Sequence, residues 1–117
     1  MRADSAMSPS LIASLLGGVF LAALGQVLFK VGATGRSSLQ DFVNPAITFG
    51  LICYGLGTVL WIIALAKAPL TFVYPFTALT FVIVYAAGVL FFGEATSLRS
   101  LTGILLILAG LFLVSGI

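Results

Sequence analysis

Two polar side chains interrupt an apolar stretch near the start of the chain. Gln26 and Lys30 lie four residues apart in the segment ALGQVLFKVG, residues 23–32. On a helix this spacing places both side chains on one face, about one turn apart. The ammonium would attract an anionic head group, and the amide would bond a polar group behind it. The alternative is structural, because a lysine near a helix end can extend to the membrane surface or pair with Glu94.

The composition indicates that these residues belong to a membrane protein. Of the 117 residues, 62% are hydrophobic and 7% are charged, whereas a soluble domain carries roughly 25% charged residues. Four apolar stretches, at about 11–32, 45–66, 70–92 and 98–116, are long enough to cross ~30 Å of hydrocarbon as helices. Strands are disfavoured because no stretch alternates in polarity as a barrel strand would. We therefore expect an all-α membrane protein with a single four-helix domain over residues 1–117.

The residues that the sequence lacks exclude several classes of function. It has no histidine and one cysteine, Cys53, so we expect neither a metal site nor a cofactor. The helices contain no embedded carboxylate and no nucleophile–base pair, so we predict no catalytic residues and no enzyme activity. A net charge of +2 is too small to indicate nucleic acid binding. The charge nearest the bilayer interior, Lys30, is positive, which favours an anionic substrate.

Aromatic residues recur at helical spacing in the second and third helices. Tyr74 and Tyr85 share one face of the segment 70–92 with Phe81, and Trp61 shares a face of 45–66 with Tyr54. Aromatic side chains beside small residues would form a wall suited to a lipid chain or an amphipathic ligand. The alternative is helix packing together with an aromatic belt at the membrane interface. Tyr74, Tyr85 and Trp61 are therefore candidate substrate-binding residues.

Pro75 interrupts the third helix soon after the proline that begins it, Pro69. Proline has no N–H to bond the carbonyl of Thr71, and its ring crowds that carbonyl. We expect a kink, which would serve either as a hinge during transport or only as a tolerated bend. At the far end of this helix, Glu94 and Arg99 are expected to form a structural charge pair.

Four short helices cannot enclose a large substrate path, so we expect the protein to function at least as a dimer. Gly103 and Gly110 are seven residues apart in the last helix and would let two copies approach closely, although packing within one copy also uses glycine. Lysine and arginine divide almost equally between the two membrane sides, counting Arg2 and Lys67 against three on the other side. This balance permits an antiparallel pair, either of two copies or with a related four-helix chain.

Three segments resemble the drug/metabolite transporter superfamily: GQVLFK at 25–30, LWIIALAKAPLTFVYPF at 60–76, and FFGEATSLRSLTGILLILAGLFLV at 91–114. The size is similar to its four-helix branches, the small multidrug resistance proteins and the ArnE/ArnF-type flippase subunits, and the last segment also looks like half of an EamA transporter. Small multidrug resistance proteins carry a glutamate eight residues before a lysine in the first helix. If Lys30 is that lysine, Ala22 occupies the glutamate position, which disfavours proton-coupled drug export.

The resemblance implies a flippase, or a flippase subunit, in the bacterial inner membrane. Its substrate would be a polyprenyl-phosphate-linked sugar or a similar anionic lipid. Lys30 would meet the phosphate, and Gln26 a neighbouring polar group. Two alternatives remain: an exporter of small solutes or drugs that lacks the usual carboxylate, and an accessory protein of a membrane enzyme that transports nothing.

Overall fold

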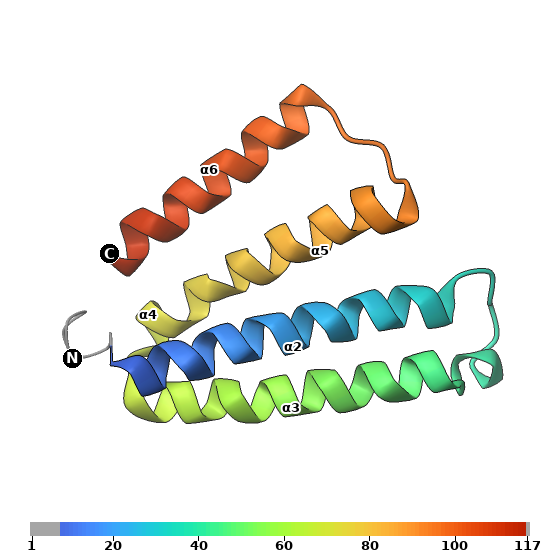
Figure 1. Cartoon of the computed structure of the whole chain (residues 1–117), viewed down its shortest axis with the longest axis horizontal. Helices are drawn as coiled ribbons and strands as arrows, with labels where there is room; N and C mark the ends of the chain where they lie inside the picture. The colour runs from blue at the N-terminus through green and yellow to red at the C-terminus, as the bar shows by residue number, and fades with distance from the viewer. Residues whose placement is uncertain (1–7, 117) are drawn as a thin grey trace.

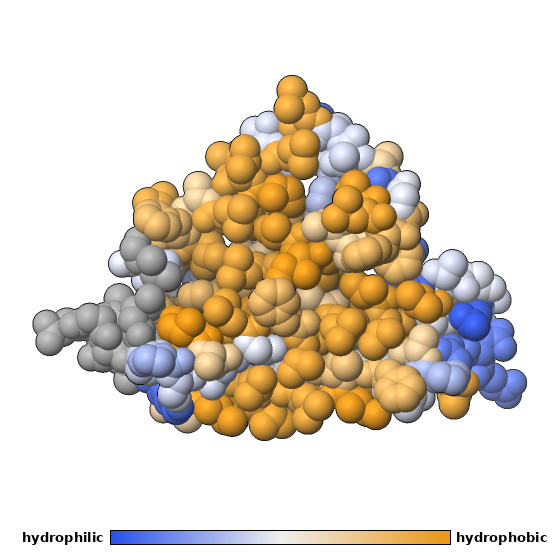
Figure 2. Space-filling model, in the orientation of Figure 1, coloured by the Kyte–Doolittle hydropathy of each residue, from blue (hydrophilic) through white to orange (hydrophobic). Residues whose placement is uncertain are grey.

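The computed structural model describes residues 8–116, so Arg2 and the residue at position 117 lie outside the described part of the chain. It contains four segments long and apolar enough to cross a membrane: Pro9–Ala33, Pro45–Lys67, Leu70–Phe92 and Leu98–Ser115. These are α2 (Pro9–Ala33), α3 (Pro45–Lys67), the composite helix α4–η2–α5, and α6 (Leu98–Ser115). The predicted all-α membrane fold is therefore confirmed. Figure 2 shows that hydrophobic residues dominate the visible surface, as expected for a protein surrounded by lipid.

Local sequence signals explain where the helices begin. The Asn44 side chain accepts a hydrogen bond from the Ile47 N–H at 3.1 Å, and Pro45 follows as the first helical residue of α3. Ser97 caps α6 by accepting a bond from the Ser100 N–H at 3.1 Å. Both caps satisfy N–H groups that have no partner within the helix. Asn44 also donates a bond of 3.1 Å to the Gly32 carbonyl, which joins the start of α3 to the end of α2.

The third span is broken where the sequence predicts a kink. It comprises α4 (Leu70–Val73), a 3₁₀ turn η2 (Tyr74–Phe76) that contains Pro75, and α5 (Thr77–Phe92). A 3₁₀ turn at this point follows from the missing proline N–H. Gly93 ends α5 in the left-handed conformation, with φ of 65°. A further 3₁₀ turn, η1 (Gln40–Phe42), lies in the link between α2 and α3.

The α2 and α3 helices pack against each other more extensively than any other two elements of the described chain, and they lie side by side along their length (Figure 1). Glycines make this approach possible at two levels. A Cβ built on Gly18 would lie 3.2 Å from the Gly57 carbonyl oxygen, and one on Gly25 would lie 2.9 Å from that of Gly50. A side chain at position 25 would force a shift of the α3 backbone, and one at position 18 would make an unusually tight contact, as at small-residue helix contacts in membranes.

The buried core lies toward the end of the molecule where α2 begins and α3 turns into α4. Its residues come from the start of α2, the end of α3 and the α4–η2 region: Leu11, Leu15, Val19, Ala64, Ala68, Phe72, Val73 and Phe76. From this end α5 and α6 diverge toward the opposite side of the molecule (Figure 1). The α5 part of the third span packs against α2, and a groove remains beside the α2–α3 pair.

Candidate functional site

A groove with a volume of about 490 Å³ lies among α2, α3 and the third span. This volume falls within the about 300–1,000 Å³ range of small-molecule sites. All three elements contribute to its walls. Its lining residues are Gly18, Ala22, Gln26, Tyr54, Gly57, Thr58, Trp61, Tyr74, Thr77, Thr80, Phe81 and Val84.

Helical spacing explains how each wall is built. On α2 the contributing residues Gly18, Ala22 and Gln26 are four apart, so they form one stripe that rises about 12 Å along the helix. Small residues in this stripe keep the backbone of α2 close to α3 and leave space in front of it. The groove is therefore elongated along the helix axes, and Gln26 lies at one end of the α2 stripe.

Three of the predicted site residues, Gln26, Trp61 and Tyr74, line this groove within a single chain. Counted along straight helices, Gln26 and Tyr74 differ by about 15 Å in depth. The elongated shape of the groove explains how both can line it without a second copy. Gln26 and Tyr74 are both exposed, so their polar groups remain open to a ligand.

Lys30 lies outside the groove lining, on the exposed surface of α2. It follows Gln26 by one helical turn, about 6 Å along the axis. From this spacing we expect the ammonium to lie near the Gln26 end of the groove. Its contact with a substrate remains a prediction.

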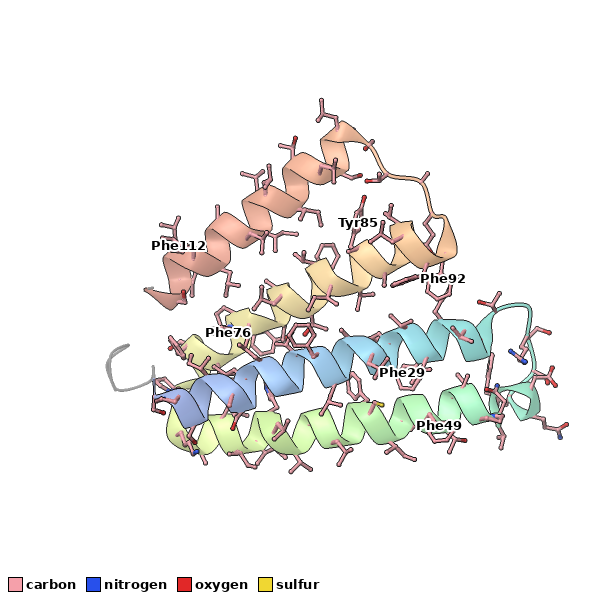
Figure 3. All side chains as sticks on the ribbon, viewed as in Figure 1. Phe29, Phe49, Phe76, Tyr85, Phe92 and Phe112 are labelled. Carbon is pink, nitrogen blue, oxygen red and sulfur yellow. The ribbon has the colours of Figure 1, made fainter. Side chains whose placement is uncertain are left out.

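Tyr85 belongs to a different part of the third span. Its hydroxyl is 2.7 Å from the Thr96 hydroxyl, in the link between α5 and α6, and its ring lies 6.1 Å from that of Phe81. Figure 3 shows Tyr85 pointing from α5 toward the α6 side of the molecule. Tyr85 is absent from the groove lining, and a role for it in substrate binding stays a prediction.

The Glu94 carboxylate lies over the end of α5. A Cβ built on Gly88 would lie 2.6 Å from Oε1 of Glu94, and the Glu94 N–H donates a 3.0 Å bond to the Gly88 carbonyl. Glycine at position 88 therefore makes room for this side chain. The predicted charge pair between Glu94 and Arg99 stays a prediction.

Three threonines in the groove were missed by sequence reasoning. The Thr58 hydroxyl donates to the Tyr54 carbonyl at 2.9 Å, and the Thr77 hydroxyl donates to the Tyr74 carbonyl at 2.9 Å. These bonds use the hydroxyl protons and leave oxygen lone pairs that can accept a bond from a ligand. The third is Thr80, which is half-buried. A helical pattern containing Thr77, Thr80, Phe81 and Val84 could have identified this wall.

The groove lining carries amide, hydroxyl, indole and phenol groups and no ionisable carboxylate or amine. No group of three or more His, Cys, Asp or Glu side chains comes together within residues 8–116. Aromatic rings with a few convergent polar groups are typical of small-molecule binding sites. The lining thus offers groups that can bind a ligand, and it contains no acid–base pair.

The α6 glycines, Gly103 and Gly110, are half-buried and have open space where a side chain would begin. A Cβ built on Gly103 or Gly110 would meet nothing within 4 Å. This finding distinguishes them from Gly18 and Gly25, which are in close contact with α3. Their predicted role as a dimer contact has space available and remains a prediction.

Curated relatives include two groups of bacterial proteins. The chain is 36% identical over 69 residues to a protein of Yersinia pestis (strain Pestoides F) described as a probable 4-amino-4-deoxy-L-arabinose-phosphoundecaprenol flippase subunit ArnE; the match covers 59% of this chain and 60% of that protein. It is 41% identical over 71 residues to a probable subunit ArnF of the same flippase from Shewanella sediminis (strain HAW-EB3), covering 59% and 49%. The chain thus spans about half to three-fifths of the length of these relatives. No solved structure matches it.

A model of the EamA-like transporter family matches residues 2–116, nearly the whole chain. The match includes all four membrane-spanning segments and the whole groove. It agrees with the resemblance seen in the segments that contain Gln26, Pro75 and Gly110. This multi-pass membrane protein belongs to the EamA-like transporter family.

Proposed function

We propose that this chain is a flippase, or a subunit of a flippase, that moves a polyprenyl-phosphate-linked sugar across a bacterial inner membrane. The observation that carries the proposal is the groove, whose uncharged polar and aromatic side chains end at Gln26, one turn before the Lys30 ammonium. The flippase subunits named among the relatives support the substrate class. Family membership supports transport rather than catalysis.

The parts of such a lipid have different requirements in the membrane. The polyprenyl chain is apolar and can remain in the bilayer, whereas the sugar and phosphate need polar partners on their way across. In this proposal the sugar occupies the groove beside Trp61 and Tyr74, and the phosphate meets Lys30. Gln26 bonds a polar group between these two regions. The 3₁₀ turn at Pro75 acts as the hinge that lets the third span move against the α2–α3 pair.

The functional unit in this proposal is a pair of chains. Its second member is another copy or a related four-helix chain, in antiparallel orientation, and Gly103 and Gly110 of α6 form part of the contact. The open space around both glycines supports this arrangement, since small residues let helices approach closely in lipid.

Vesicles from the host membrane test the proposal, because they retain any partner subunit. A synthetic polyprenyl phosphate sugar is added to one leaflet, and a membrane-impermeant oxidant of sugar diols measures how much remains accessible. Vesicles containing the chain should protect the sugar progressively, and vesicles from a deletion strain should not. Equal protection in the two preparations would contradict flippase activity.

A drug exporter is the second candidate, because four aromatic side chains line the groove: Tyr54, Trp61, Tyr74 and Phe81. Aromatic rings attract quaternary ammonium groups by about 0.5–2 kcal/mol. Against this candidate, Ala22 lines the groove where a proton-coupled exporter would carry a carboxylate. Drug-driven proton release from the purified protein in liposomes, above that of empty liposomes, would favour this alternative.

A further inference from the structure

The charge pattern of the groove limits which sugar it can accept. Its polar groups are an amide, three threonine hydroxyls, two phenols and an indole, and all are uncharged. The acidic residues of the described chain lie elsewhere: Asp41 is in the α2–α3 link, and Glu94 lies over Gly88 at the end of α5. A positively charged group in the groove would therefore have no carboxylate beside it.

From this pattern we infer that the groove selects a lipid-linked sugar that carries only hydroxyl groups and rejects one that carries an ammonium group. The inference rests on the proposed flippase function and specifies its substrate. It also separates this chain from the curated relatives, whose names specify an amino sugar.

The lining of the groove provides hydrogen-bond donors and acceptors for the hydroxyl groups of a sugar. Thr58 and Thr77 have given their protons to backbone carbonyls, so each oxygen accepts a bond that a sugar hydroxyl can donate. The exposed Gln26 amide both donates and accepts. The ring of Trp61 offers an apolar surface to the C–H face of the sugar.

An ammonium group is disfavoured because no charged partner for it lines the groove. Its transfer from water to a membrane groove is costly unless a carboxylate pairs with it, and the attraction of an aromatic ring is smaller than that cost.

Two synthetic lipids test the inference in host membrane vesicles. Both carry the same polyprenyl phosphate; one has a pentose with free hydroxyls, and the other has the same pentose with one hydroxyl replaced by an amine. The hydroxyl sugar should cross at least about tenfold faster, a difference of 1.4 kcal/mol in the barrier. Equal rates, or faster crossing of the amino sugar, would overturn the inference and leave the flippase proposal standing. If the chain moved neither lipid, both the inference and the flippase proposal would be overturned.

A charge variant sharpens the same experiment. Gln26→Glu introduces a carboxylate of nearly the same shape into the groove and should shift the rate ratio toward the amino sugar by about tenfold. Gln40→Glu is the matched control, because Gln40 is the chain's other glutamine and lies in the α2–α3 link outside the groove. An unchanged ratio of the two rates in folded Gln26→Glu protein would contradict the inference. The comparison of the two lipids with the unmodified protein decides the question even if this variant does not fold.

Discussion

Glycines spaced seven residues apart occur in both α2 and α6, but the two helices use them differently. In α2 the glycines at positions 18 and 25 touch the backbone of α3, and 33% of the most apolar part of the helix is buried. In α6 a Cβ built on the glycines at positions 103 and 110 would meet nothing within 4 Å, and only 6% of the most apolar part of that helix is buried. Glycines with the same spacing can therefore pack two helices of one chain together, or leave a helix surface open to a partner.

The largest expected effect comes from breaking the α2–α3 contact. Gly25→Ala would place a methyl group 2.9 Å from the Gly50 carbonyl oxygen, and the backbones must separate to accommodate it. We expect a loss of about 1–3 kcal/mol in the free energy of unfolding, measured by denaturation in detergent. Gly55→Ala is the matched control on α3, because a Cβ there meets nothing within 4 Å. Equal stability of the two variants would contradict a glycine-dependent α2–α3 contact.

The second test compares a cation on α2 with one on α6. Lys30→Ala should reduce transport by about tenfold or more, because a charge-assisted bond to phosphate is lost, whereas Lys30→Arg should retain most activity. Arg99→Ala, at the start of α6, should leave transport nearly unchanged. Initial rates in host membrane vesicles measure all three. Loss of folded protein in both Lys30 variants would instead support a structural pair between Lys30 and Glu94.

The third test concerns assembly through α6. The double substitution Gly103→Leu and Gly110→Leu fills open space within one chain, so the fold should persist. The dissociation constant of the dimer should rise about tenfold or more, because larger side chains keep the two helices apart. Crosslinking as a function of dilution in detergent measures it, with Gly55→Leu on α3 as control. An unchanged dissociation constant would remove α6 from the dimer contact.

The smallest expected effect distinguishes two similar threonines. The hydroxyls of Thr58 and Thr102 each donate to the carbonyl four residues earlier at 2.9 Å, but only Thr58 lines the groove. Thr58→Val should slow transport by about three- to tenfold through loss of one ligand hydrogen bond. Thr102→Val on α6 should have no effect on the transport rate. A similar loss of transport rate in both variants would indicate that the bond from the hydroxyl to the helix backbone matters, and not a contact with the ligand.

The fold could be predicted largely from sequence because its determinants are local. Four apolar stretches of membrane-spanning length predict the helices, and Asn44, Ser97 and Pro75 mark caps and a break that depend on neighbouring residues only. Helix bounds agree within a few residues, since α2 begins at Pro9 where 11 was expected.

The site was harder to predict because it depends on how helices lie against one another. Gln26 and Tyr74 differ by about 15 Å in depth along straight helices, and it is the elongated groove between the helices that includes both. Tyr85 shares a helical face with Phe81, yet its hydroxyl lies within hydrogen-bonding distance of Thr96 in the following link. Such a contact depends on the path of the α5–α6 link, which helical periodicity does not specify.

The most direct test of the account is ligand binding reported by Trp61. This residue is the chain's single tryptophan and lines the groove, so its fluorescence reports occupancy of the groove. Titration of the purified protein with a polyprenyl phosphate sugar should produce a saturable change in emission, and the same lipid phosphate without a sugar should produce little change. No change with the lipid-linked sugar, or an identical change with the phosphate alone, would contradict the claim that this groove binds the sugar.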